Sequence, residues 1–336
     1  MTLISTYLPL NLHATHHQPA LMKYPHDHWI ELEHNYVRTM RARQDLMAKY
    51  SSHIYFAPES PAAELACREL MEMVFSFLVK RYPRHFSLSR DKTVLTNYLL
   101  DKTTNLKTTS PLMALFENVP EDYAIMLRNE RDGQYYLRAA VVCSSVGWDI
   151  GLHKNAPLSK IHAHVPDADR MAMSMDRWFG RLSTDQPVFR CSWSLEDWEA
   201  MFTSPHVAGM EGWTRSAFVG REGELKVGDL KLRCDAQTLR RLPLSGAVVF
   251  NFKAIFTPFG EMRREKYVPR LLCTVLEGGK ENLIGYKCEE HVRRVAMGAL
   301  REWADEQVRE GRVPADWEVG TLEESPFFPG WEGKCT

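Results

Sequence analysis

The chain has 336 residues, of which 44% are hydrophobic and 25% are charged, and its formal net charge is -1 at pH 7. This balance excludes a general binder of nucleic acid or of anionic membranes, because such proteins need a strong basic excess. The seven cysteines form no CxxC pair, which excludes the usual zinc-ribbon and thioredoxin patterns.

Cysteine usage and hydropathy also predict the compartment. An odd number of scattered cysteines is typical of buried free thiols in a reducing environment. No apolar run approaches the ~18 residues that a membrane span requires. The opening residues MTLISTYLPL lack the charged n-region of a secretory signal. We therefore expect a cytoplasmic protein with no membrane span.

Residues 1–25 are predicted to form a flexible arm at the surface. The arm contains His13, His16 and His17. No carboxylate or cysteine lies in register with these histidines, so their spacing does not favour a metal site.

Two packing helices are expected after the arm. Apolar residues at helical spacing predict the first over residues 27–50. Ser60 as N-cap and Pro61 at the first helical position begin the second. This second helix is expected to end before Pro83, since a proline disfavours helical backbone in the residue that precedes it.

The middle of the chain changes from helical to strand-like patterns. Residues 84–109 are polar and are expected to form an irregular loop, followed by a short helix from Ser110. Two strands are predicted over residues 123–128 and 134–143, because the glycine-containing turn at residues 130–133 joins two strand-like segments.

A further helix is predicted to begin after Asp167, which is a suitable N-cap. Met171, Met175, Trp178 and Leu182 lie on one face of this helix. Methionines at this spacing can line a flexible pocket, but core packing is the simpler interpretation.

The second half of the chain is predicted to alternate strands and helices. In residues 236–256 we expect a short helix ended by Pro243, then an apolar strand from Ala247 covered on both faces. The other expected elements are strands at 188–193, 214–219 and 228–234, a helix after Tyr267 and a long helix over 290–310.

These elements predict an α+β fold. Two strands, a helical insertion and several further strands are the element order of a PAS-type antiparallel sheet. We therefore expect a PAS-like antiparallel sheet with helical N- and C-terminal extensions. It is predicted to form a single domain over residues 26–311, followed by an irregular aromatic strap over residues 312–336.

The stretch most informative about function is GWDIGLHKNAPLSKIHAHVP, residues 147–166. His162 and His164 lie among apolar residues, where an imidazole loses water while one ring nitrogen can still bind a ligand. A structural histidine that bonds to a backbone carbonyl is the alternative. The residues alone leave both interpretations open, and His153 is a third imidazole in the same stretch.

Three stretches resemble one family, the alpha subunit of haem-dependent oxidative N-demethylase and its relatives. They are YYLRAAVVCSSVGW leading into PLSKIHAHVP, then PVFRCSW, then AQTLRRLPLSGAVVF. The corresponding forms in the family are close to IHxPVP, Arg-x-Asn-Trp and ERQTLRRLP. With the flanking helices the resemblance covers roughly residues 25–310, and the combination is specific although each piece alone is weak.

The resemblance implies a PAS-like fold that binds haem b noncovalently and activates O2 to oxidise a small N-methyl amine. In the characterised member the substrate is dimethylamine, and electrons come from NADPH through separate flavin and iron–sulfur subunits. This chain has no flavin, nicotinamide or iron–sulfur fingerprint of its own. An enzyme of this kind therefore needs an external NAD(P)H-dependent flavin/iron–sulfur reductase.

The resemblance also implies an axial ligand for the haem iron. His162 matches the histidine of the family motif, and a single imidazole ligand leaves one coordination position for oxygen. His164 stands where the family has a proline, so it is the alternative ligand. His153 stays open as well.

Other candidate site residues come from the same motif-matched stretches. Trp148 is a candidate to pack on the porphyrin. Arginine suits bidentate pairing with the haem propionates, and the candidates are Arg190, Arg240 and Arg241. The candidate catalytic residues, which offer hydrogen bonds or charge to oxygen or an amine, are Asp235, Gln237 and Thr238. For each residue a structural role is the alternative.

The chain departs from the family at Asp235-Ala236, where the family has Glu-Arg. Ala236 deletes a guanidinium, and Asp235 withdraws a carboxylate by one methylene, so dimethylamine is not carried over as the substrate. The alternative functions are a haem-binding PAS-type sensor of gases or redox state, and a non-catalytic haem protein.

Overall fold

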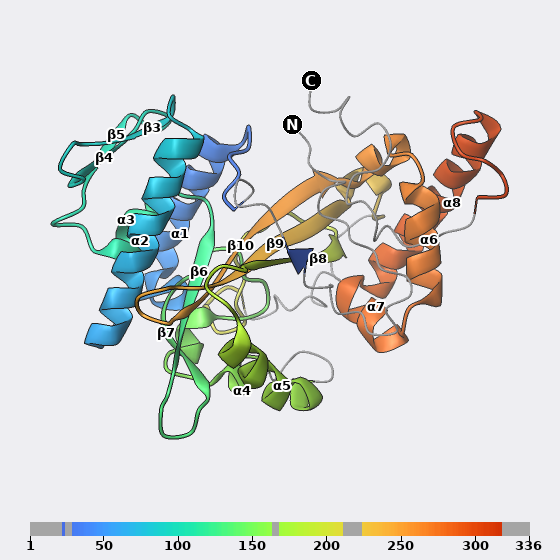
Figure 1. Cartoon of the computed structure of the whole chain (residues 1–336). Coiled ribbons are helices and arrows are strands. Elements are labelled where there is room, and N and C mark those ends of the chain that lie inside the picture. Colours follow the sequence, from blue (N-terminus) through green and yellow to red (C-terminus); the bar gives the residue numbers. More distant parts are fainter. Residues whose placement is uncertain (1–21, 24–28, 163–167, 211–223, 318–336) are drawn as a thin grey trace. The chain divides into compact units, whose positions relative to one another are not determined.

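The computed structural model describes residues 22–23, 29–162, 168–210 and 224–317. Contacts divide it into two compact units (Figure 1). The N-terminal unit consists of the described residues of Met22–Phe189 together with Gln237–Lys253. The C-terminal unit contains the described residues of Arg190–Ala236 and of Ala254–Thr336. The expectation that residues 26–311 form a single domain stays a prediction.

Three helices of the N-terminal unit form where they were expected, with one corrected boundary. They are α1 (Tyr36–Ile54), α2 (Pro61–Arg81) and α3 (Pro111–Phe116). Ser60 caps α2 by accepting a hydrogen bond from the Ala63 N–H at 3.3 Å. The predicted start of α1 was too early. The Tyr82 hydroxyl donates to Ile30 O at 2.9 Å and accepts from Leu32 N at 3.3 Å, which holds this segment in a non-helical conformation.

The predicted loop over residues 84–109 is wrong, because it contains a three-stranded antiparallel sheet. Its strands are β3 (Phe86–Leu88), β4 (Val94–Asn97) and β5 (Lys102–Asn105). Only every second residue of β4 is buried, namely Leu95 and Asn97. The Asn97 amide donates to the Tyr36 hydroxyl at 2.8 Å. The strands are too short for periodicity to reveal them, and a buried asparagine hides the alternation.

A seven-stranded sheet has the order β1-β8-β9-β10-β6-β7-β2. β6 pairs antiparallel with β7 and with β10, and β2 with β7. The helical insertion between β7 and β8 consists of η3 (Ile150–His153), α4 (Leu158–Ile161) and α5 (Ala168–Arg181). The strands are β1 (Met22–Lys23), β2 (Tyr55–Phe56), β6 (Asp122–Arg128), β7 (Tyr135–Val141), β8 (Val188–Glu196), β9 (Lys231–Arg241) and β10 (Val248–Pro258).

The predicted short helix before Pro243 is also wrong, since the chain continues as strand β9 to Arg241. Residues 237–240 are all buried, so the strand is covered on both faces. Tertiary packing therefore overrides the helical preference of alanine, glutamine, leucine and arginine. The turn into β10 is closed by Leu242 N donating to Ala247 O at 2.8 Å, and Gly246 adopts a φ of 67° there.

The two faces of the sheet in the N-terminal unit carry different side chains. One face carries alternate residues of the strands, and these join a single hydrophobic cluster. Its buried members are Phe56, Ala124, Met126, Tyr135, Leu137, Ala140, Val142, Ile150, Leu158, Phe179, Leu182, Leu239, Val248 and Phe252. We call this group the insertion cluster, because the helical insertion contributes to it. The intervening residues Tyr123, Asn251 and Lys253 project to the opposite face.

The C-terminal unit contains most of the remaining helices. They are η4 (Val227–Asp229), η5 (Phe259–Arg264), α6 (Val268–Gly278), α7 (Glu281–Lys287) and α8 (Glu290–Arg309). The helices predicted after Tyr267 and over residues 290–310 are confirmed by α6 and α8. Trp303 of α8 packs on Phe259 with ring centroids 5.4 Å apart. The expected strand over 214–219 and most of the predicted strap lie outside the described residues.

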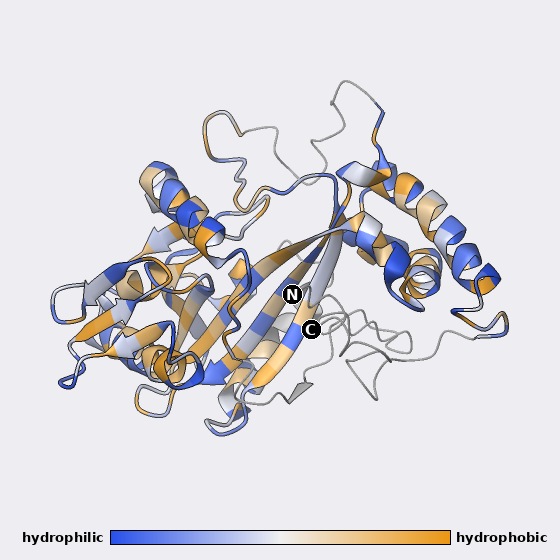
Figure 2. Cartoon of the chain, turned by 90° about the horizontal axis from the view of Figure 1, so that it is seen from above, coloured by the Kyte–Doolittle hydropathy of each residue, from blue (hydrophilic) through white to orange (hydrophobic). Residues whose placement is uncertain are grey.

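Helices together with antiparallel strand pairs confirm the α+β class, and the PAS-like assignment stays a prediction. Hydrophilic residues occur along the helices of both units (Figure 2). In the described part of the chain, no helix combines the length and the apolar character needed to cross a membrane.

Candidate functional site

The stretch that carries His162 is fixed against strand β7. Asn155 N donates to Leu137 O at 3.0 Å, and Leu137 N donates to Ala156 O at 3.0 Å. Gly151 must be a glycine here, because an added Cβ would lie 2.1 Å from Ser52 O. These contacts fix the segment before α4 against the sheet. They therefore also restrict the position of His162 at the end of α4.

His162 ends α4 and is half-buried. Its Nδ1 lies 3.0 Å from the carbonyl oxygen of Leu158. A carbonyl oxygen can only accept, so Nδ1 carries the hydrogen and the lone pair of the neutral ring is on Nε2. Histidines that bind metals through Nε2 usually have this arrangement, in which a backbone carbonyl fixes the tautomer. The structural alternative uses the same bond to the carbonyl, so both interpretations include this contact.

Large apolar side chains are only partly buried where they pack against the insertion cluster. We call them the apolar fringe: Trp148, Ile161, Met175, Trp178, Val188 and Phe250. Ile161 directly precedes His162, so the imidazole lies beside the fringe in the chain. The fringe also contains Met175 and Trp178 of the predicted methionine face, whereas Leu182 is buried in the insertion cluster. His164 and Asp167 lie outside the described residues.

These residues fit a flat and largely apolar macrocycle held through one imidazole. Haem needs two things, an imidazole nitrogen that carries a lone pair and an apolar surface against the porphyrin. Nε2 of His162 meets the first requirement, because Nδ1 carries the hydrogen that is donated to Leu158 O. Partly exposed tryptophan, phenylalanine, methionine and aliphatic side chains of the fringe meet the second.

Arg241 has the contacts of a structural residue. Its Nε donates to Leu182 O at 2.7 Å, and its Nη1 donates to Gly246 O at 2.7 Å. Its Nη2 donates to the Tyr135 hydroxyl at 2.9 Å and also to Phe179 O. The guanidinium thus joins the end of α5 to the β9–β10 turn. These contacts favour the structural alternative over a propionate partner.

Successive side chains of strand β9 project to opposite faces of the sheet, and this divides the remaining site candidates of the N-terminal unit between the two faces. Leu239 belongs to the insertion cluster, so Gln237 projects to the same face. Thr238 and Arg240 project to the other face. There the Thr238 hydroxyl donates to the side-chain amide oxygen Oδ1 of Asn251, and the Arg240 guanidinium lies 4.3 Å from the ring centroid of Trp29. Of these three residues, Gln237 alone shares the face that carries the fringe.

Asp235 and Arg190 belong to the C-terminal unit, unlike the other site candidates. The Asp235 carboxylate accepts from Arg233 Nε at 2.9 Å and pairs with its Nη2 at the same distance. Arg190 is partly buried. Burial lowers the pKa of its guanidinium, and the negative charge of Asp235 acts in the opposite direction.

Sequence reasoning missed a buried ionic group at the start of strand β6. Arg43 Nη1 lies 2.5 Å from Asp122 Oδ1, and both side chains are fully buried. Nearby, Lys253 Nζ pairs with Glu33 at 2.6 Å and lies 3.7 Å from Glu121. One signal was available: Arg43 follows Tyr36 and Met40 at helical spacing, which places a charge on the apolar stripe of α1.

His53 and Asp149 form a second contact that the sequence did not reveal. His53 Nδ1 contacts the Asp149 carboxylate, whose other oxygen accepts from Gly151 N at 2.8 Å. Within the described part of the chain, no group of three or more His, Cys, Asp or Glu side chains is arranged to hold a metal ion.

Comparison with known families gives one finding. The family model HODM_asu-like, described as haem-dependent oxidative N-demethylase, alpha subunit-like, matches residues 20–297. The match includes the stretch of His162, the apolar fringe and strand β9.

Proposed function

The chain belongs to the family of haem-dependent oxidative N-demethylase, alpha subunit-like proteins. From this premise we propose that it binds haem b through His162 and uses O2 to oxidise a small N-methyl amine. The description of the family itself names haem dependence and oxidative N-demethylation. The axial ligand, the type of haem and the amine are our proposal.

The observation that carries the proposal is the hydrogen bond between His162 Nδ1 and Leu158 O. It leaves the lone pair of the neutral ring on Nε2, and the preceding residue, Ile161, belongs to the apolar fringe, whose side chains suit a porphyrin. Bound haem would supply the oxygen activation and the oxidising equivalents. In this scheme His162 would hold the iron, and Trp148 and Phe250 would help to exclude water from the macrocycle.

Gln237 is the residue we propose to orient the amine or the bound oxygen. It is buried and shares the face of β9 with Leu239 of the insertion cluster. Thr238 projects to the opposite face and bonds to Asn251, so we propose a structural role for its hydroxyl. Asp235 stays a candidate for a charge effect on the substrate. Electrons would come from an external NAD(P)H-dependent flavin/iron–sulfur reductase.

The first experiment tests haem binding and the ligand together. The full chain is reconstituted with haem, and the Soret band is recorded for wild type, His162→Gly and His164→Ala. His34→Ala, an exposed histidine of the same unit, is the matched control. We expect His162→Gly alone to lose the native spectrum and added imidazole to restore it. Loss in His164→Ala alone would move the ligand to that residue, and the absence of a Soret band in wild type would contradict the proposal.

The second experiment tests catalysis and separates Gln237 from Thr238. Haem-loaded protein is supplied with a reductant and O2, and N-methyl amines are screened for formaldehyde. We expect Gln237→Leu to lower turnover about tenfold or more without changing the Soret band, and Thr238→Val to retain turnover. Haem binding without product from any amine would instead support the non-catalytic or sensor alternative.

A further inference from the structure

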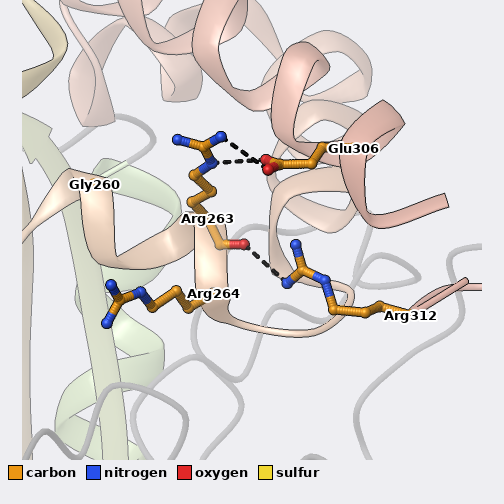
Figure 3. A pocket seen from close by; sticks show the side chains of 5 residues that line it. All are labelled: Gly260, Arg263, Arg264, Glu306 and Arg312. Atoms are coloured by element: carbon orange, nitrogen blue, oxygen red, sulfur yellow. Dashed lines mark hydrogen bonds and ion pairs between the residues drawn. The ribbon is translucent and has the colours of Figure 1, made fainter. Parts of the chain in front are cut away.

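The C-terminal unit contains a pocket whose lining is dominated by arginine. It has a volume of about 470 Å³ and is lined by Gly260, Arg263, Arg264, Glu306 and Arg312. Gly260, Arg263 and Arg264 come from η5, Glu306 from α8, and Arg312 from the segment after α8. Figure 3 labels these five residues and shows Arg263 facing Glu306. None of the residues that line the pocket is a candidate haem residue, and His162, Trp148 and Phe250 belong to the N-terminal unit.

The backbone that carries these arginines is held by a buried glutamine of α8. Gln307 is 1% exposed. Its amide nitrogen donates to Arg263 O at 3.0 Å and to Glu265 O at 2.9 Å, and its amide oxygen accepts from Tyr267 N at 3.1 Å. Three bonds from one buried side chain fix the chain direction from residue 263 to residue 267. The arginine side chains therefore start from an ordered backbone, which lowers the entropic cost of binding a ligand.

Two of the three arginines are themselves oriented by neighbouring groups. Arg263 donates to both carboxylate oxygens of Glu306, from Nε at 2.6 Å and from Nη2 at 2.8 Å. Arg312 donates from Nε to Glu310 at 2.6 Å and from Nη1 to Arg263 O at 3.4 Å. These bonds use only part of each guanidinium, because arginine has five N–H donors.

Arg264 differs from its neighbours. It is exposed, and within the described residues it makes no hydrogen bond or ion pair; Figure 3 draws no dashed line to it. The lining contains three guanidinium groups and one carboxylate, so positive charge is in excess. One unpaired guanidinium and two oriented ones in the lining of one pocket are suited to bind an anion.

We propose that this pocket binds a small phosphate-bearing anion. Arginine forks match the oxygens of phosphate, and several forks around one hollow suit a ligand with several oxygens. The volume is within the range of small-molecule sites, about 300–1,000 Å³. The lining is charged rather than apolar, so the ligand is an anion and not a hydrophobic molecule. The proposal is independent of haem and of the amine reaction.

Titration with inorganic pyrophosphate by isothermal calorimetry tests the proposal on the full chain at low ionic strength. We expect saturable binding of one pyrophosphate per chain with a dissociation constant below about 1 mM. Arg264→Gln is expected to weaken binding about tenfold or more, the effect of losing one charge-assisted hydrogen bond. Arg301→Gln is the matched control, because Arg301 is an exposed arginine of α8 that pairs with Glu277 and does not line the pocket.

A second variant fills the pocket without removing any charge. A Cβ added at Gly260 meets no atom within 4 Å, so Gly260→Leu is expected to fold normally and to obstruct the ligand. We expect it to weaken pyrophosphate binding as much as Arg264→Gln does, at an unchanged melting temperature. Equal weakening in Arg264→Gln and Arg301→Gln would show an unspecific charge effect and overturn the proposal. Absence of saturable binding by wild type, or binding of citrate in place of pyrophosphate, would overturn it as well.

Discussion

Two arginine–carboxylate pairs, one in each unit, have similar shortest N–O distances and opposite surroundings. Arg43 and Asp122 lie 2.5 Å apart with both side chains at 0% exposure. Arg263 and Glu306 lie 2.6 Å apart with side-chain exposures of 52% and 19%. The N–O distance alone would predict that the two pairs contribute equally to stability. Removing one partner of a buried pair leaves an uncompensated charge, whereas water replaces the partner in an exposed pair.

The buried pair also organises backbone, which the exposed pair does not. Asp122 accepts from Cys143 N at 2.9 Å and from Ser144 N at 2.7 Å, and Arg43 donates to Glu121 O at 3.0 Å. The pair thus joins α1 to the start of β6 and to the residues after β7. Its contribution lies in satisfying several buried polar groups at once, since buried polar atoms without partners are costly.

The largest expected effect is on Arg43. Arg43→Met removes the cation but keeps most of the side-chain volume, so Asp122 is left as a buried, unpaired carboxylate. We expect the free energy of unfolding to fall by about 3–5 kcal/mol. Urea denaturation at pH 7 measures this loss. A change below about 1 kcal/mol would show that the buried pair is energetically equivalent to an exposed one.

The second largest effect is on the pH dependence of the free energy of unfolding, to which Glu121 contributes up to about 3 kcal/mol. Burial raises the pKa of Glu121 from 4.5 to about 7, and the positive charge of Lys253 opposes this rise. A raised folded-state pKa means that the folded chain binds the proton more tightly than the unfolded chain. The resulting stability is present below pH 4.5 and is lost as pH rises through about 7. Between pH 5 and pH 8, wild type should lose more stability than Glu121→Gln, and parallel curves for the two proteins would contradict this.

Arg241 provides an intermediate case, because it is partly buried and donates chiefly to backbone carbonyls. Arg241→Met should lower the free energy of unfolding by about 2 kcal/mol, the cost of leaving buried acceptors without donors. The Soret band of the haem-loaded protein should keep its position. A shifted band with unchanged stability would instead support the propionate role that the sequence suggested.

The smallest effect is expected at the exposed pair. Arg263→Ala should change the free energy of unfolding by less than about 1 kcal/mol, and salt should reduce the difference further. Denaturation of wild type and variant at low and high ionic strength checks this. A loss as large as that of Arg43→Met would mean that exposure does not distinguish the two pairs.

The sequence predicted well what depends on local signals. Ser60 and Pro61 marked the start of α2, and the turn at residues 130–133 between two strand-like segments marked β6 and β7. It failed at β9, where both faces are buried and the period of two disappears. It failed again at β3–β5, which are only three or four residues long.

For the candidate site, the sequence predicted which segments carry the site residues, but not the face of the sheet to which each side chain projects. His162 and Gln237 were identified from a resemblance. That Thr238 and Arg240 project away from the insertion cluster depends on β9 being a strand, which the sequence did not reveal. The partners of Arg241 are mostly backbone carbonyls. A carbonyl has the same chemistry at every residue, so no pattern of side chains predicts such contacts.

The division of the chain has a practical consequence. The boundaries after residues 189, 236 and 253 all fall inside strands, namely β8, β9 and β10. Neither unit is therefore one uninterrupted piece of polypeptide, and no single cut releases either of them with its strands whole. A gene fragment encoding residues 22–189 would omit the inner strand β10 that pairs with β6. Recombination between relatives would for the same reason have to exchange the two units together.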